Sequence, residues 1–256
     1  MEKHIIEFEG REFPVVEPTI ELWNKMSVLK DLYSEEDFSL MMISIATGLS
    51  TEDLREAEWE GVYNTSQYLA NYFLQDGEKF YNEFEFEGVK YRFINLDKLT
   101  FGEFIDIDEF LSKPEGERMS KMNHLMALFY REVNDDGTSP PYNANLVPER
   151  SEKFRKLPLK YLRSSLNFFF SFRKHIEKKY PLIFIPNDGE VDTDNKNSFE
   201  GFWGWYSILV YLSGEDILKI QEIASKNLIE VFNYLTYMKD LTMLRERELK
   251  KTLQKV

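Results

Sequence analysis

Two stretches decide the fold: HIIEFEGREFPVV at residues 4–16 and EFEFEGVKYRFIN at residues 83–95. Both contain the tetrapeptide EFEG, first at residues 7–10 and again at residues 85–88. Apolar residues alternate with charged residues on both sides of the Glu-Gly pair, and this period of two is typical of a half-buried strand. Each stretch therefore predicts a β-hairpin that turns at its Glu-Gly pair.

A helical pattern follows each predicted hairpin. Pro18 is expected in the first turn of a helix over residues 18–33, where its missing N–H is not needed. Asp97 is expected to cap a second helix over residues 98–111. We infer a duplicated hairpin-plus-helix module, because the strand alternation and the following helix match as well as the tetrapeptide.

The remaining chain shows mostly helical patterns with recognisable ends. Ser34 and Ser50 are expected to begin helices, and Gly48 to end one. Further helices are predicted at residues 117–131 and 149–180, the second divided by Pro158, and at residues 214–225 and from Asn227 onwards. The sequence LSTEDL at residues 49–54 resembles LSGEDI at residues 212–217. This similarity indicates either a further duplication or only a common way to begin a helix.

These patterns predict a mainly α fold with two small β-hairpins, an α+β protein with a helical C-terminal region. The expected division is a hairpin-plus-helical module at 1–80, a second at 81–182, a polar linker at 183–198 and the helical region at 199–256. The last helix ends in RERELKKTLQKV, which is charged all round, so it is expected either to project into solvent or to bind a partner.

Composition limits the classes of function. The net charge is −13, which argues against nucleic-acid binding because phosphate contacts need a basic face. The acidity fits either a solvated surface or a basic protein partner. The chain has no cysteine, no secretory signal pattern at its N-terminus and no apolar run long enough to span a membrane, so a protein of a reducing cytoplasm is expected.

No catalytic signature emerges. His4, His124 and His175 lie far apart and in no metal-ligand spacing, and no phosphate-binding glycine motif is present. The acidic run at residues 188–197 lacks the spacing of a calcium loop and is interpreted as a solvated linker. We therefore expect no catalytic residue, no metal, no cofactor and no enzymatic activity, although an enzyme with dispersed carboxylates stays open as a rival.

The most unusual local feature is the aromatic cluster of Phe202, Trp203, Trp205 and Tyr206 around a glycine, directly after the predicted linker. Such rings either pack against a helix core or form a binding surface, where Trp and Tyr are enriched. We predict that these four residues take part in binding a protein partner.

Three runs resemble phage tail-assembly-chaperone-like proteins of large tailed phages of Bacteroidota hosts. The N-terminal run contains FPVVEPTIELWNKM and SLMMISIATGLSTEDLREAEW. The middle run contains LTFGEFIDIDEFL and NHLMALFYREV, and the C-terminal run is SILVYLSGEDILKIQEIASKNLIEVFNYLTYMK. The runs are patterns of apolar and small residues, and the duplicated hairpins depart from the simplest form of such proteins.

The resemblance implies a non-enzymatic role in building the phage particle. The chain would bind a tail or head–tail protein, either as a chaperone in the host cytoplasm during assembly or as a structural part of the virion. Two similar modules would then give avidity towards a repeating partner in a multi-copy assembly. The alternative is a stand-alone acidic helical adaptor that binds a single protein.

Overall fold

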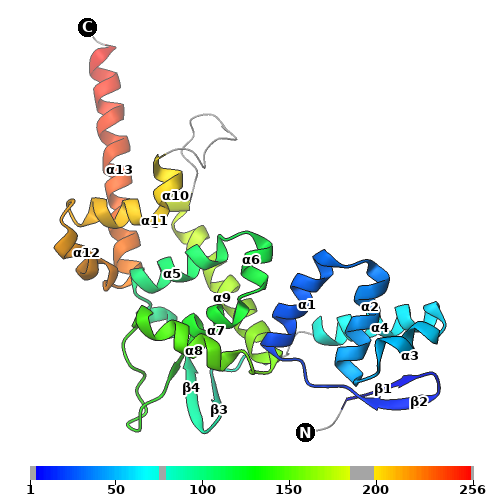
Figure 1. Ribbon diagram of the computed structural model, residues 1–256. Coiled ribbons are helices and arrows are strands. Elements are labelled where there is room, and N and C mark those ends of the chain that lie inside the picture. Colours follow the sequence, from blue (N-terminus) through cyan, green and yellow to red (C-terminus); the bar gives the residue numbers. More distant parts are fainter. Residues whose placement is uncertain (1–3, 75–78, 185–198, 255–256) are drawn as a thin grey trace. The chain divides into compact units, whose positions relative to one another are not determined.

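The computed structural model describes residues 4–74, 79–184 and 199–254, with the side chains of residue 74 and residues 199–202 left out. Figure 1 shows a mainly helical chain with two small antiparallel sheets, which confirms the predicted fold class. The chain divides into two compact units: residues up to 93 with 110–168 form unit 1, and residues 94–109 with 169 onwards form unit 2.

The elements of unit 1 are β1 (Ile5–Phe8), β2 (Arg11–Pro14), α1 (Ile20–Leu32), α2 (Glu35–Thr47), α3 (Thr51–Glu56), α4 (Trp59–Leu74), β3 (Glu83–Phe86), β4 (Val89–Phe93), α6 (Glu115–Met119), α7 (Met122–Phe129), β5 (Tyr130–Glu132), η2 (Ala144–Leu146) and α8 (Val147–Phe154). Those of unit 2 are η1 (Leu96–Lys98), α10 (Pro181–Phe184), α11 (Phe199–Leu212), α12 (Ile217–Ala224) and α13 (Leu228–Leu253). Helices α5 (Phe101–Leu111) and α9 (Leu159–Lys179) have residues in both units.

Both predicted hairpins are present and share one geometry. In the first, Phe8 pairs with Arg11, and in the second Phe86 pairs with Val89, so each loop is the two-residue Glu-Gly pair. The φ angles are +49° and +72° at Glu9 and Gly10, and +52° and +77° in the second copy. Positive φ at both positions is the signature of the type I′ turn, whose twist matches that of the strands.

The helix ends agree with the sequence in part. Ser34 and Ser50 cap α2 and α3 through their hydroxyls, and Gly48 ends α2 with φ +81°. Pro18 lies outside the helix, contrary to expectation, because Thr19 provides the cap by accepting the N–H of Leu22.

The predicted cap at Asp97 is also wrong, because that residue lies within the 3-10 turn η1. The true start of α5 is a capping box. The Thr100 hydroxyl accepts the N–H of Glu103, and the Glu103 carboxylate in turn accepts the N–H of Thr100 at 2.9 Å.

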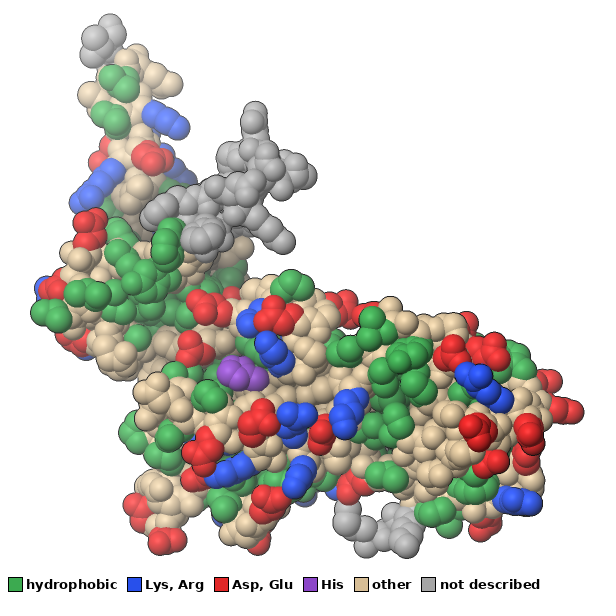
Figure 2. Space-filling model, in the orientation of Figure 1, with side chains coloured by type: hydrophobic (Ala, Val, Ile, Leu, Met, Phe, Trp, Pro, Cys, Tyr) green, Lys and Arg blue, Asp and Glu red, His purple; other side chains and the backbone are tan. Residues whose placement is uncertain are grey.

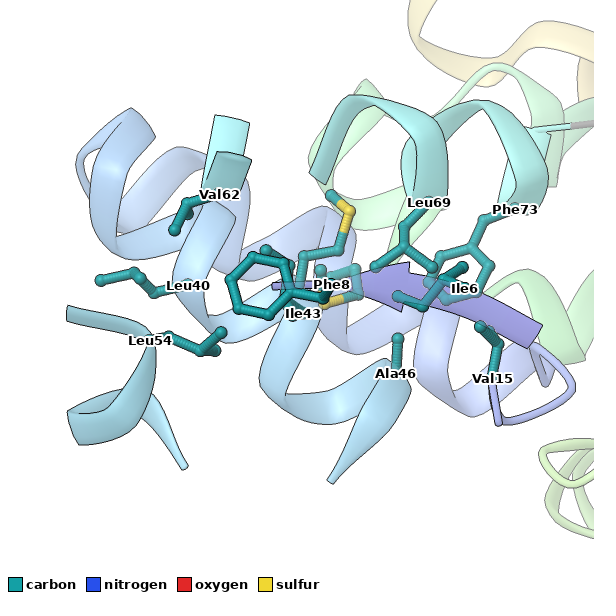
Figure 3. Packing of buried hydrophobic residues seen from close by; sticks show 12 residues of the cluster. Ile6, Phe8, Val15, Leu40, Ile43, Ala46, Leu54, Val62, Leu69 and Phe73 are labelled. Atoms are coloured by element: carbon teal, nitrogen blue, oxygen red, sulfur yellow. The ribbon is translucent and has the colours of Figure 1, made fainter. Parts of the chain in front are cut away.

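The first core of unit 1 lies beneath the N-terminal hairpin. Alternation along β1 turns Ile6 and Phe8 towards the helices, while the intervening Glu7 stays exposed. Figure 3 shows these two side chains meeting apolar residues of α2, α3 and α4, among them Ile43 and Leu69, which are fully buried. The hairpin is therefore stabilised by the helices that follow it.

The second hairpin acquires a third strand. The helix predicted at residues 117–131 ends earlier than expected, because Tyr130 and Arg131 belong to β5, which pairs antiparallel with β4. The reason is tertiary: the fully buried Tyr130 ring packs against Phe84 and Phe93, with ring centroids 4.8 and 5.3 Å away. Burial of this aromatic side chain favours the extended backbone at the end of α7 over another helical turn.

Helix α1 joins the N-terminal elements to the middle of the chain within unit 1. Ile20 and Glu21 donate their N–H groups to the carbonyls of Leu157 and Arg155. A buried amide, Asn123, accepts a hydrogen bond from Asn24 at 2.8 Å and donates to Ser151. These contacts place residues of both expected hairpin modules in a single compact unit.

Unit 2 is built on rings around Phe232 of α13. Phe104 of α5, Tyr180 and Phe184 all lie edge-on to this ring, at centroid distances between 5.5 and 5.7 Å. The backbone adds an antiparallel bridge between Thr100 and Asn227. The helix that follows the second hairpin thus packs with the C-terminal helices, so the units differ from a division into consecutive modules.

Candidate protein-binding surface

The predicted aromatic cluster is split by the structure. Trp205 lies in the ring core of unit 2, parallel to Phe232 with centroids 5.9 Å apart and edge-on to Phe104 at 5.4 Å. Its indole N–H donates to the Asp108 carboxylate at 2.8 Å. Trp205 is therefore half-buried among the rings of unit 2, with its one polar group satisfied.

Trp203 and Tyr206 have the opposite environment. They are 44% and 42% exposed, and their rings contact each other at a centroid distance of 5.6 Å. Gly204 separates Trp203 from Trp205 with φ +48° and ψ −129°, a backbone conformation that interrupts the helix and that glycine adopts at least cost. The fourth predicted residue, Phe202, lies outside the residues whose side chains are described.

Helix α12 provides further exposed apolar side chains. None of its residues is fully buried, and Ile217 and Leu218 at its start are 77% and 87% exposed. Asp216 fixes this start, because its carboxylate accepts the N–H of Leu218. The sequence of α12 already indicates exposed apolar residues, because they cover too wide an arc of this short helix for one buried face.

The last residue of α12, Ala224, lies close to α5. A Cβ atom added at Gly102 would lie 3.2 Å from both the Cβ and the carbonyl oxygen of Ala224. The glycine therefore permits the two helices to approach, and this contact fixes the orientation of the exposed pair Ile217 and Leu218.

Helix α13 adds two tyrosines near its base. Val231, Phe232 and Leu235 are buried, whereas Tyr234 and Tyr237 on other faces of the helix are exposed. We name seven of the exposed residues of α11, α12 and the first half of α13 the apolar surface: Trp203, Tyr206, Tyr211, Ile217, Leu218, Tyr234 and Tyr237. Figure 2 shows hydrophobic side chains gathered over α11 and α12 on the face in view.

The described residues show no arrangement typical of a metal centre. No group of three or more His, Cys, Asp or Glu side chains is placed to hold an ion in this part of the chain. Within the same residues, no helix is long and apolar enough to cross a membrane.

Two groups with shifted pKa values, Tyr130 and Arg131, lie in β5 of unit 1. Burial raises the pKa of the Tyr130 phenol, which donates a hydrogen bond to the Tyr81 carbonyl at 2.6 Å. Burial and the nearby charge of Arg150 lower the pKa of Arg131 to about 10, so its guanidinium stays charged at neutral pH. Arg131 donates to the carbonyl of Pro140, which secures the loop after β5.

Comparison with protein families, curated proteins and solved structures gave no match to this chain.

Proposed function

We propose that this chain is a non-enzymatic protein that binds other proteins during the assembly of a tailed phage particle, as a chaperone or as a structural part of the virion. The observation that carries the binding role is the apolar surface of unit 2, where Leu218 is 87% exposed. Exposed apolar patches of this kind are typical of protein interaction sites. The phage context rests on the resemblance of the three sequence runs described above.

The chemistry of the surface suits an apolar helical segment of a tail or head–tail protein. Its rings and aliphatic side chains offer contact area, and Trp and Tyr lose few torsions on binding. The chain's net charge of −13 would keep the complex soluble while the partner's apolar side chains are covered.

The test is co-expression of the full chain with each tail, tape-measure and head–tail protein encoded beside its gene. The chain should keep at least one of them soluble and co-purify with it. Trp203→Ala combined with Leu218→Ser should weaken this binding about thirtyfold, with an unchanged circular dichroism spectrum. Tyr33→Ala is the matched control, because Tyr33 is an exposed ring of unit 1.

Two outcomes would overturn the proposal. If the neighbouring genes encode no particle proteins and the chain instead binds one unrelated protein, it is an adaptor. If a neighbouring particle protein binds equally well to the double variant, the apolar surface is not the binding site.

A further inference from the structure

Charge is distributed unevenly along the chain. Residues 1–74 contain fifteen Asp and Glu but five Lys and Arg, which gives −10 of the total −13. Residues 239–256 contain six Lys and Arg and three Asp and Glu, which gives +3. One chain therefore carries a strongly acidic region and a basic region of opposite sign.

The acidic region includes an exposed aromatic pair where α3 meets α4. Trp59 and Tyr63 are one helical turn apart, with ring centroids at 6.1 Å, and both are exposed. Glu58 and Glu60 flank Trp59, and no ion pair recorded among the described residues involves either of them. We name these four residues the acidic aromatic edge.

The basic region includes the second half of α13. Helix α13 has 26 residues, and its buried residues end at Leu235. Figure 1 shows its C-terminal half extending beyond the other helices of its own unit. Here Leu249 and Leu253 are 61% and 67% exposed, again one turn apart. We name residues 245–253 (RERELKKTL) the basic leucine tip; it contains Arg245, Arg247, Lys250 and Lys251 with Glu246 and Glu248, a net charge of +2.

We propose that the basic leucine tip of one copy docks on the acidic aromatic edge of a second copy. Each surface presents two apolar side chains one turn apart. The edge is acidic, whereas the residues around the tip carry a net positive charge, because its four Lys and Arg outnumber Glu246 and Glu248. Pairing tip with tip, or edge with edge, would bring like charges together, so the electrostatics favour the mixed pairing. An amphipathic helix laid on an apolar site is a common mode of recognition.

Because the two surfaces differ, the contact is heterologous. Each copy has one tip and one edge, so association continues from copy to copy into a ring or an open chain. This inference concerns surfaces other than the apolar surface of unit 2 and does not depend on the proposed function.

The first test is the mass of the full chain by sedimentation velocity over a range of concentrations. We expect the mass to rise with concentration at low salt and to fall towards the monomer at about 0.5 M NaCl, where charges are strongly screened. A monomer at every concentration, as docking within one copy would give, overturns the proposal.

The second test separates mixed pairing from tip-to-tip pairing. Leu249→Ser with Leu253→Ser removes the tip, and Trp59→Ser with Tyr63→Ser removes the edge. Each variant alone should lose association by about thirtyfold. An equimolar mixture should recover a dimer and stop there, because one variant supplies the only intact tip and the other the only intact edge.

Leu32→Ser is the control, since Leu32 is 70% exposed and belongs to neither surface. All substituted side chains are exposed, and circular dichroism verifies that each variant is folded. If the edge variant alone still associates, or the mixture stays monomeric, the proposed contact is wrong.

Discussion

The indole N–H of Trp205 donates a hydrogen bond to the carboxylate of Asp108 at 2.8 Å, across 97 positions of the chain. Asp108 is 8% exposed and also forms an ion pair with Arg173, whose Nη2 lies 2.8 Å from Oδ1. This one carboxylate therefore joins α5, α9 and α11, and it secures the helix next to the exposed Trp203 and Tyr206.

Replacing Asp108 with alanine should destabilise unit 2 by about 2–3 kcal/mol, because the Trp205 N–H loses its acceptor and the Arg173 guanidinium loses its ion-pair partner. Asp108→Asn should cost less, since its amide oxygen still accepts from Trp205. Urea unfolding monitored by circular dichroism measures both effects. Asp97→Ala is the control at an exposed position of the same unit, and equal midpoints for it and Asp108→Ala would contradict the prediction.

The approach of α5 to α12 predicts an unusual response at Gly102. In an exposed helix, Gly→Ala adds about 1 kcal/mol of stability. At Gly102 the new Cβ would meet the Ala224 backbone oxygen at 3.2 Å, which cannot rotate away. We expect Gly102→Ala to give no gain, and Gly102→Leu to destabilise by ~2 kcal/mol or more.

Gly61→Ala is the matched comparison, because Gly61 is an exposed residue of α4 with no atom within 4 Å of the added Cβ. It should raise the free energy of unfolding by about 0.5–1 kcal/mol. Thermal unfolding of Gly102→Ala, Gly102→Leu and Gly61→Ala measures the change in stability of each variant relative to the parent. A gain at Gly102→Ala as large as that at Gly61→Ala would show that the helices are not in close contact.

The type I′ turns predict opposite effects at neighbouring positions. Gly88→Ala should cost about 1–2 kcal/mol, because an L side chain at φ +77° clashes with its own backbone. Glu87→Asn should stabilise by a few tenths of a kcal/mol, since Asn tolerates the φ of +52° better than Glu. Urea midpoints measure both, and a stabilising Gly88→Ala would rule out this turn.

Glu83 gives the protein a defined pH dependence. Hydrogen bonds from Lys90 and Arg92 lower the pKa of its carboxyl from 4.5. A carboxyl whose pKa is lowered by folding stabilises the fold above its unfolded pKa, and this contribution is lost as pH falls through the folded pKa. We therefore expect Glu83→Gln to destabilise by less than ~1 kcal/mol at about pH 7, because the pair is partly exposed.

At about pH 3 the difference between Glu83→Gln and the parent should shrink, since this pH lies below the carboxyl's ordinary pKa of 4.5, where the lowered folded pKa stabilises the fold less. Arg92→Gln removes one of the two partners and should weaken this pH dependence. Urea unfolding at the two pH values measures it. A destabilisation by Glu83→Gln that grows as the pH falls would contradict the assignment.

Much of the local structure was determined by the sequence alone. The Glu-Gly pairs and their flanking alternation fixed both hairpins, because two residues at positive φ and a period of two leave few other conformations. Ser34, Ser50 and Gly48 marked helix ends for a similarly local reason, since each supplies a group or backbone angle needed within one turn. Pro158 divided α8 from α9 as expected.

The tertiary structure decided what depends on residues distant in sequence. Tyr130 became part of a strand because rings from β3 and β4 bury it, and helical propensity could not predict this. Thr100 caps α5 in place of Asp97. Both residue types are good N-caps, so the sequence by itself did not distinguish between these two nearby positions.

The aromatic cluster depended on the same kind of distant contact. Its composition was consistent with packing in a core or with an exposed binding surface. The kink at Gly204 separates the cluster into one residue that packs against the other rings of unit 2 and two that are exposed. Trp205 turns to Asp108 and Phe232, while Trp203 and Tyr206 remain exposed. Local sequence determines which backbone conformations are low in energy. Whether a side chain is buried depends on the partners that the fold brings to it, and those partners lie about a hundred positions earlier or some twenty-five later in the chain.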